Sequence, residues 1–238
     1  MHMLAFLYTW DPTYLLFVML PAGLLALWAQ FKVKSAYAQM SRRPVSSGMT
    51  GAQAAQRILE AHGIYHVGIE PARGFLSDHY DPRHKVLRLS PEVFHGRSIA
   101  SVGIAAHEVG HAIQDASNYT ALVVRNGIVP LANLGGSLSM IILIVGFALQ
   151  STGMIAAGIA LFSLLVLFQI VNLPVEFNAS SRARAALVSS GVIVPAEDPL
   201  VGKVLNAAAM TYVAATIGAI LQLLYFLMRS GLLGGRRE

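Results

Sequence analysis

Residues 126–175 read NGIVPLANLGGSLSMIILIVGFALQSTGMIAAGIALFSLLVLFQIVNLPV and contain no aspartate, glutamate, lysine or arginine. A helix needs about 20 apolar residues to cross the hydrocarbon core of a bilayer, so this stretch is too long for one crossing and suits two. The polar segment Gln150-Ser151-Thr152-Gly153 lies near its middle and is typical of a turn. We therefore predict a helical hairpin with membrane-spanning helices at 128–149 and 154–175.

Two further stretches, residues 13–31 and 204–228, also contain no charged side chain. At ~1.5 Å per residue the first extends for about 28 Å, which matches the thickness of the hydrocarbon core. Pro21 is expected to bend it. The whole chain is 55% hydrophobic and 12% charged, which lies outside the usual range of soluble proteins. Together with the hairpin, these stretches predict a membrane protein with four spans.

The remaining composition limits the classes of partner and of metal site. The 238 residues include no cysteine, so a transition metal would have to be bound by histidine, aspartate or glutamate. The formal charge of +5 comes from scattered basic residues without clustered aromatics, which indicates no nucleic-acid partner. Basic residues follow the first span, at Lys32 to Arg43, and none precedes it. The positive-inside bias then places the next region in the cytoplasm, and a bacterial-type cytoplasmic (inner) membrane fits this pattern.

That region, residues 44–126, is predicted to be a cytoplasmic α+β insert. Thr50 and Gln53 have the spacing of a capping box at the start of an alanine-rich helix. The segment Ser77 to Pro82 is rich in turn-forming residues. The expected elements are helices at 51–61 and 98–116 and short strands at 67–70 and 85–90.

His107-Glu108-Val109-Gly110-His111 is an H-E-x-x-H motif inside the predicted helix 98–116. Residues four apart share one helical face, so both imidazoles can bind one Zn²⁺ while Glu108 acts as general base on a water. Chance occurrence and buried structural histidines are the alternative interpretations. A glutamate and two histidines among apolar neighbours are costly to bury without a partner, and a divalent cation satisfies all three. Gly103 and Gly110 allow another helix to approach closely, although simple core packing explains them equally well.

A catalytic zinc site needs a third protein ligand, and no histidine follows His111. Asp115 is too close on the same helix, and Glu197 with Asp198 lies between prolines in a predicted loop. Glu176 remains, at the end of the uncharged stretch and the start of a predicted helix at 176–188. The alternative is a glutamate that merely extends towards the membrane interface.

His79 and Tyr80 are candidate catalytic residues of a weaker kind. They precede a predicted edge strand, where a peptide could pair and a donor could stabilise the oxyanion. A polar turn is the competing interpretation. His62 and His66 are also four apart, but Gly63 interrupts the helix between them, so a second metal site is not expected.

Several blocks of the sequence, taken together, resemble the YugP-like neutral zinc metallopeptidases of bacterial membranes. The resemblance covers residues 14–228 and implies a gluzincin-like site, related in layout to the HtpX-type proteases, with Glu176 as third ligand. The family pattern has aspartate where this chain has Asn178, a departure that concerns a charge beside the ligands and not the ligand set. The blocks are 76–82, 87–90, 96–100, 107–114 and 172–180.

The predicted fold class is therefore mainly α, a multi-span membrane protein with a small α+β zincin-like insert. The leading functional hypothesis is a membrane-embedded zinc endopeptidase whose active site faces the cytoplasm and whose substrates are loops, tails or misfolded segments of membrane proteins. A non-catalytic zinc-containing adaptor is the alternative, but structural zinc sites have four protein ligands and no fourth is evident in the sequence. A transporter is a third class, and the predicted spans contain no charge pair to line a path.

Overall fold

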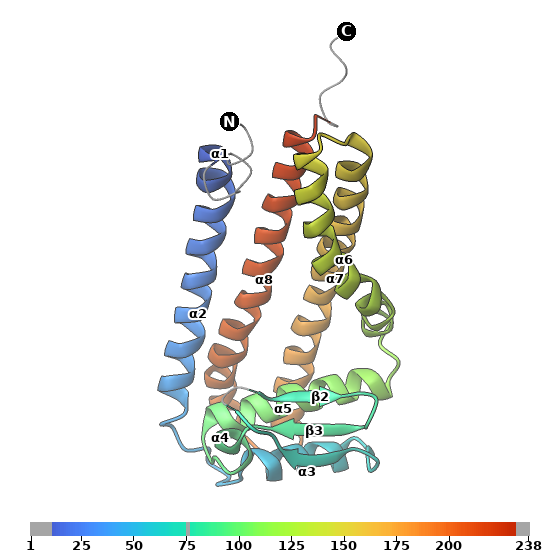
Figure 1. Ribbon diagram of the computed structural model, residues 1–238. Helices are drawn as coiled ribbons and strands as arrows, with labels where there is room; N and C mark the ends of the chain where they lie inside the picture. The colour runs from blue at the N-terminus through green and yellow to red at the C-terminus, as the bar shows by residue number, and fades with distance from the viewer. Residues whose placement is uncertain (1–10, 75–76, 232–238) are drawn as a thin grey trace. The chain divides into compact units, whose positions relative to one another are not determined.

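The computed structural model describes residues 11–74 and 77–231, and the chain divides into two units (Figure 1). The helical unit comprises Met1–Trp28, Val124–Leu173 and Thr211–Glu238. The α+β unit comprises Ala29–Val123 and Pro174–Met210. Each unit has its own cluster of buried apolar side chains.

The described residues include four helices that are long and apolar enough to cross a membrane. Large apolar side chains such as Phe17, Leu27 and Ile141 are exposed on them, as expected for surfaces that face lipid. This confirms the predicted fold class, mainly α with several spans. The four candidate spans are Pro12–Met40, Thr120–Ala148, Thr152–Ser189 and Pro195–Arg229. The elements that form them are α1 (Pro12–Tyr14), η2 (Leu15–Met19), α2 (Leu20–Met40), α6 (Thr120–Ala148), α7 (Thr152–Ser189), η3 (Pro195–Glu197) and α8 (Asp198–Arg229).

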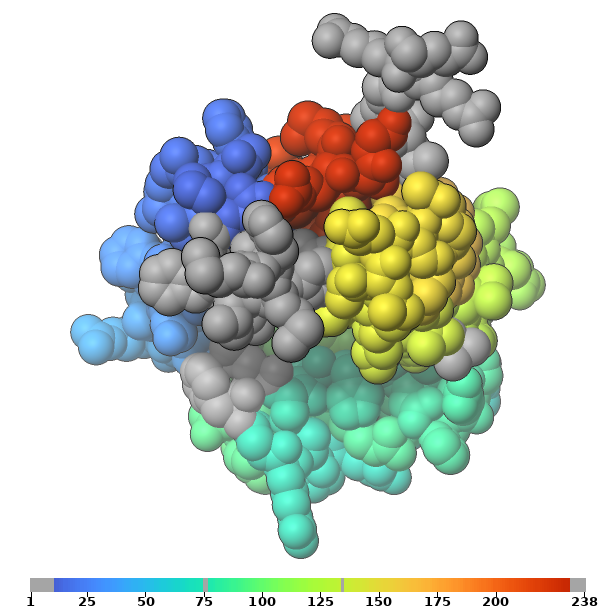
Figure 2. Space-filling model, turned by 45° about the horizontal axis from the view of Figure 1, so that its top comes forward, coloured from blue at the N-terminus to red at the C-terminus, as the bar shows by residue number. Residues whose placement is uncertain are grey.

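The helical unit is held together by aromatic and aliphatic packing. Phe162 of α7 and Phe226 of α8 meet edge to face with ring centroids 5.4 Å apart, and Leu143 of α6 is buried in the same cluster. Figure 2 shows the turn between α6 and α7 (yellow) beside the end of α8 (red). The π-helical turn η2 ends two residues before Pro21, whose ring nitrogen cannot donate a helical hydrogen bond.

The α+β unit contains a three-stranded sheet and the helices packed on it. The sheet order is β1-β3-β2, with β1 and β3 parallel and β2 antiparallel to β3, so β2 is an edge strand. Both reciprocal hydrogen bonds of the capping box at Thr50 and Gln53 are present at the start of α3. The elements are α3 (Gly51–Ala61), β1 (Gly68–Pro71), β2 (His79–Asp81), β3 (Val86–Leu89), α4 (Pro91–Phe94) and α5 (Ile99–Ala116).

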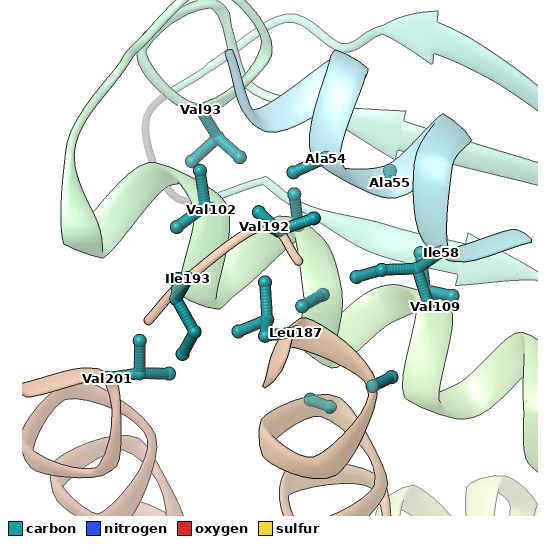
Figure 3. Packing of buried hydrophobic residues seen from close by; sticks show 14 of the residues in the cluster. Ala54, Ala55, Ile58, Val93, Val102, Val109, Leu187, Val192, Ile193 and Val201 are labelled. Atoms are coloured by element: carbon teal, nitrogen blue, oxygen red, sulfur yellow. The ribbon is translucent and has the colours of Figure 1, made fainter. Parts of the chain in front are cut away.

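The core of this unit lies where α3, α5 and α7 meet (Figure 3). Ile58 of α3, Val109 of α5 and Leu187 of α7 are each fully buried there. Because α5 contributes one face to this core, its orientation is fixed before any ligand is considered. The packing therefore determines which way the H-E-x-x-H face of α5 points.

The structure differs from the sequence-based boundaries in several places, and Glu197 and Asp198, expected in a loop, lie in η3 and at the start of α8. Residues 79–81 form strand β2 inside the segment expected to be a turn, because β2 pairs with β3. Helix α2 continues to Met40 rather than ending near Phe31. Helix α7 is one helix from Thr152 to Ser189 and continues through Pro174, so the third predicted span and the following ligand helix are a single element.

Candidate metal centre

Helix α5 presents the two histidines of the motif on one face. Ser98 caps the helix by accepting a hydrogen bond from the N–H of Ser101, which sets where the helical repeat begins. The imidazoles of His107 and His111 lie with ring centroids 4.8 Å apart and nearly perpendicular planes, at 85°. The four-residue spacing thus brings two nitrogen donors to one point.

Helix α7 brings a carboxylate to the same point. Glu176 Oε2 lies 3.3 Å from His107 Nε2 and 3.7 Å from His111 Nε2. Donor atoms bound at about 2.0–2.2 Å to a tetrahedral zinc stand about 3.3–3.6 Å apart, so the first separation falls in this range and the second lies just above it. Within the described residues these three side chains form the group of donors suited to a metal.

A close helix crossing makes this convergence possible. A Cβ atom built on Gly110 of α5 would lie 2.4 Å from the carbonyl oxygen of Ala179 of α7. Ala179, Ala183 and Ala186 are buried along the contacting face of α7. Small residues on both sides therefore let the two backbones approach until Glu176 reaches the imidazoles.

Glu108 lies beside the three donors and is held by the edge strand. Its side chain is 8% exposed, and its Oε2 accepts a hydrogen bond of 3.0 Å from the backbone N–H of Tyr80 in β2. That N–H points away from β3, so the outer edge of β2 faces Glu108. Burial disfavours a charge on His111, but the Glu176 and Glu108 carboxylates outweigh burial and raise the pKa of His111. The site therefore favours a cation.

The other side of each imidazole is also hydrogen-bonded. His107 Nδ1 lies 3.1 Å from Ser180 Oγ, and His111 Nδ1 lies 3.0 Å from Gln114 Oε1. Sequence reasoning did not single out Gln114 or Ser180 for this role. Gln114 could have been found from its spacing, because it follows His111 by three residues and so shares its helical face.

The structure places the competing carboxylates elsewhere. Asp115 accepts hydrogen bonds from Tyr80 Oη at 2.6 Å and Lys85 Nζ at 2.5 Å. Glu197 accepts from the backbone and hydroxyl of Ser46. Asp198 pairs with Arg184. Of the downstream acids weighed from the sequence, Glu176 is the one that joins the two histidines, and Glu238 lies outside the described residues.

The two weaker candidates both lie in strand β2. Burial and the hydrogen bond to Asp115 raise the pKa of the Tyr80 hydroxyl well above its usual range. The exposed His79 has Nδ1 2.8 Å from the carbonyl oxygen of Ser77. A carbonyl only accepts, so His79 Nδ1 is the donor and Nε2 is an acceptor in the neutral ring.

Two aspartates fix the strand that carries these residues. Asp78 accepts hydrogen bonds from the N–H and hydroxyl of Ser90, and burial raises the pKa of Asp78 above its ordinary value despite them. The Arg88 guanidinium, followed by His84, holds the pKa of Asp81 well below its usual range. These contacts anchor both ends of β2 and so hold the Tyr80 amide opposite Glu108.

Comparison with known proteins gives the family of the chain. A family model described as "Putative neutral zinc metallopeptidase" matches residues 15–231. The "Putative membrane protease YugP" of Bacillus subtilis (strain 168) is 49% identical over 226 residues, which cover 94% of this chain and 100% of that protein. No solved structure matches the chain. The chain belongs to the neutral zinc metallopeptidase family.

Proposed function

We propose that this protein is a zinc-dependent endopeptidase in which His107, His111 and Glu176 bind the metal and Glu108 is the general base. The observation that carries the proposal is the convergence of two imidazoles and one carboxylate from α5 and α7 at zinc-like separations. Three protein donors leave a fourth tetrahedral position open, which is typical of catalytic rather than structural zinc sites.

Zinc, when bound, supplies the Lewis acidity that activates a water and polarises the scissile carbonyl. Glu108 accepts the proton of that water during attack on the carbonyl and delivers it to the leaving amine. The Tyr80 N–H holds Glu108 Oε2 and leaves its other carboxylate oxygen available for the proton. The residue therefore acts as base and not as ligand.

The outer edge of β2 is the proposed position of the substrate. An extended peptide can add to an edge strand through backbone hydrogen bonds, and since the Tyr80 N–H on this edge is donated to Glu108, the peptide would pair through the Tyr80 carbonyl. His79 and Tyr80 would lie beside such a peptide, which is why both are kept as candidate catalytic residues. The Tyr80 hydroxyl is donated to Asp115 and the His79 Nδ1–H to the Ser77 carbonyl, so His79 would reach the oxyanion as a donor only with a proton on Nε2.

The proposed substrates are loops, tails or misfolded segments of membrane proteins. Four apolar helices support a membrane location, and the Bacillus relative is named a membrane protease. Glu176 also lies in the same helix as the predicted span 154–175 and follows its last residue directly. A peptide bond close to the bilayer surface is therefore within the reach expected of the site.

We expect Glu108→Gln to lower peptide hydrolysis at least about 100-fold while zinc stays bound, because the amide cannot accept the proton. The glutamine still offers an oxygen to the Tyr80 N–H, so the local fold should be kept. Hydrolysis of a membrane-protein substrate in proteoliposomes and zinc content by mass spectrometry measure the two effects. Unchanged turnover in the variant would reject the enzyme and favour the non-catalytic adaptor.

We also propose that the α+β unit and its active site face the cytoplasm of a bacterial inner membrane, as the basic residues after the first span indicate. The chain has no cysteine, so Ser47→Cys and Thr152→Cys each introduce a single exposed thiol. An impermeant maleimide added to intact spheroplasts should label position 152 and spare position 47 until the membrane is opened. The reverse pattern would contradict the proposed orientation.

A further inference from the structure

Gln114 is a buried polar residue that the proposed chemistry does not use. It lies on α5 with no exposed surface, and its side chain touches both helices of the metal centre. Its Oε1 is 3.0 Å from His111 Nδ1, and its Nε2 is 2.8 Å from the carbonyl oxygen of Val175 and 3.0 Å from Asn178 Oδ1. All three hydrogen bonds of this buried amide can form only when its oxygen and its NH₂ group each face the correct partners.

The groups at the far end of this chain of hydrogen bonds fix its direction. The Val175 carbonyl can only accept, so the group that faces it must be the Gln114 NH₂. Arg182 Nε can only donate, and it lies 2.7 Å from Asn178 Oδ1, so this oxygen is also an acceptor. A flipped Gln114 amide would place its oxygen against two acceptors at once. The contacts therefore allow one orientation, with Gln114 Oε1 towards His111.

An oxygen in that place requires a hydrogen on His111 Nδ1. The lone pair of the neutral ring is then on Nε2, which is the nitrogen that faces Glu176 Oε2. His107 is different, because the Ser180 hydroxyl can donate or accept and so does not dictate a tautomer. Gln114 therefore dictates the tautomer of His111, whereas Ser180 does not dictate that of His107.

We propose that Gln114 is a positioning residue that fixes His111 as the Nδ1–H tautomer and ties it to α7 one residue before Glu176. The inference rests on the proposed zinc site and deepens it. A single buried amide links a nitrogen ligand on α5 to the backbone next to the carboxylate ligand on α7, so loosening it disturbs two of the three ligands together. Asn178, held by Arg182, keeps that amide in its orientation.

The test uses the full-length detergent-solubilised protein and measures Zn²⁺ affinity by competition with a chromophoric chelator. Gln114→Leu should bind Zn²⁺ about 10–100-fold more weakly, the usual effect of losing a hydrogen-bond partner of a ligand histidine. Gln114→Glu keeps an acceptor for His111 Nδ1–H but sets its second oxygen against the Val175 carbonyl and Asn178 Oδ1, so it should recover only part of that loss. Gln114→Asn stays polar but is one methylene too short, so it should also bind Zn²⁺ about 10–100-fold more weakly. It provides the test if Gln114→Leu does not fold. Ser180→Ala should weaken Zn²⁺ binding less than Gln114→Leu or Gln114→Asn.

Proton NMR of the Co²⁺-loaded protein gives a readout that a general packing defect would not reproduce. A histidine bound through Nε2 keeps an exchangeable Nδ1–H whose signal is shifted by the cobalt. The His111 signal, told apart from the His107 signal by the change that Ser180→Ala causes in the latter, should exchange slowly with solvent in the wild type and in Gln114→Glu, and rapidly in Gln114→Asn. Wild-type affinity and slow exchange in Gln114→Asn would overturn the role of Gln114 while leaving the zinc site intact. Failure of the wild type to bind either metal would instead reject the proposed function.

Discussion

Glu176→Ala should remove zinc and peptide hydrolysis together. Two imidazoles alone bind zinc weakly, and Glu176 Oε2 is the anionic donor that stands 3.3 and 3.7 Å from the two imidazole Nε2 atoms. Loss of a direct ligand should weaken zinc binding by more than the roughly 100-fold expected for an outer contact. Metal analysis of the purified variant, followed by a hydrolysis assay in excess zinc, measures both effects.

The neighbouring acids give matched controls for this variant. Glu197→Ala removes contacts with Ser46, and Asp198→Ala removes the pair with Arg184, but neither residue lies in the donor group. Both variants should bind zinc like the wild type. Glu108→Gln completes the set, because it should lose hydrolysis alone. Full zinc content in Glu176→Ala, with zinc loss in one of the control variants, would overturn the ligand assignment.

Gly110→Ala should disable the site without touching a ligand. The new methyl group would lie 2.4 Å from the Ala179 carbonyl oxygen and 3.2 Å from the Ala179 Cα, and backbone atoms cannot rotate away. Helices α5 and α7 would have to separate by about 1 Å, and a misplacement of that size can cost about 100-fold in rate. We expect a comparable loss of hydrolysis, weaker zinc binding, and a free energy of unfolding reduced by about 1–3 kcal/mol.

Gly103→Ala on the same helix is the control for that prediction. Its methyl group would meet Val201 Cγ1 at 3.2 Å, a milder overlap with a side-chain atom in place of the 2.4 Å backbone clash at Gly110. Both substitutions gain about 1 kcal/mol of helix propensity, so any difference between them reports the contact and not the helix. Thermal unfolding, zinc affinity and hydrolysis should all stay near wild type in Gly103→Ala. Equal behaviour of the two variants would show that the crossing at Gly110 does not set the site.

Much of the fold could be predicted because the relevant signals are local. A stretch without charges must be long enough to match a bilayer, and this length is visible in residues 126–175 without knowledge of any contact. Strand β2 was harder to predict from the sequence. Its three residues lie among turn-forming neighbours, and they are a strand because β3 and Glu108 take up their backbone groups. Pro174 likewise predicts a weak point in a helix, yet α7 continues through it because buried alanines pack the following turns against α5.

The sequence by itself determined that His107 and His111 share a helical face with Glu108 beside them, since that follows from 3.6 residues per turn. It also reduced the third donor to one acid by elimination. Only the tertiary structure decided that Glu176 reaches those imidazoles, that Gln114 contacts one of them, and that the Tyr80 amide holds the proposed base. These contacts join residues from separate elements, and they depend on how closely two helices cross and on which edge of the sheet faces them. Periodicity along the chain carries no information on how closely α5 and α7 approach or on which sheet edge faces them. The packing of Gly110 against Ala179 sets the distance between the two helices.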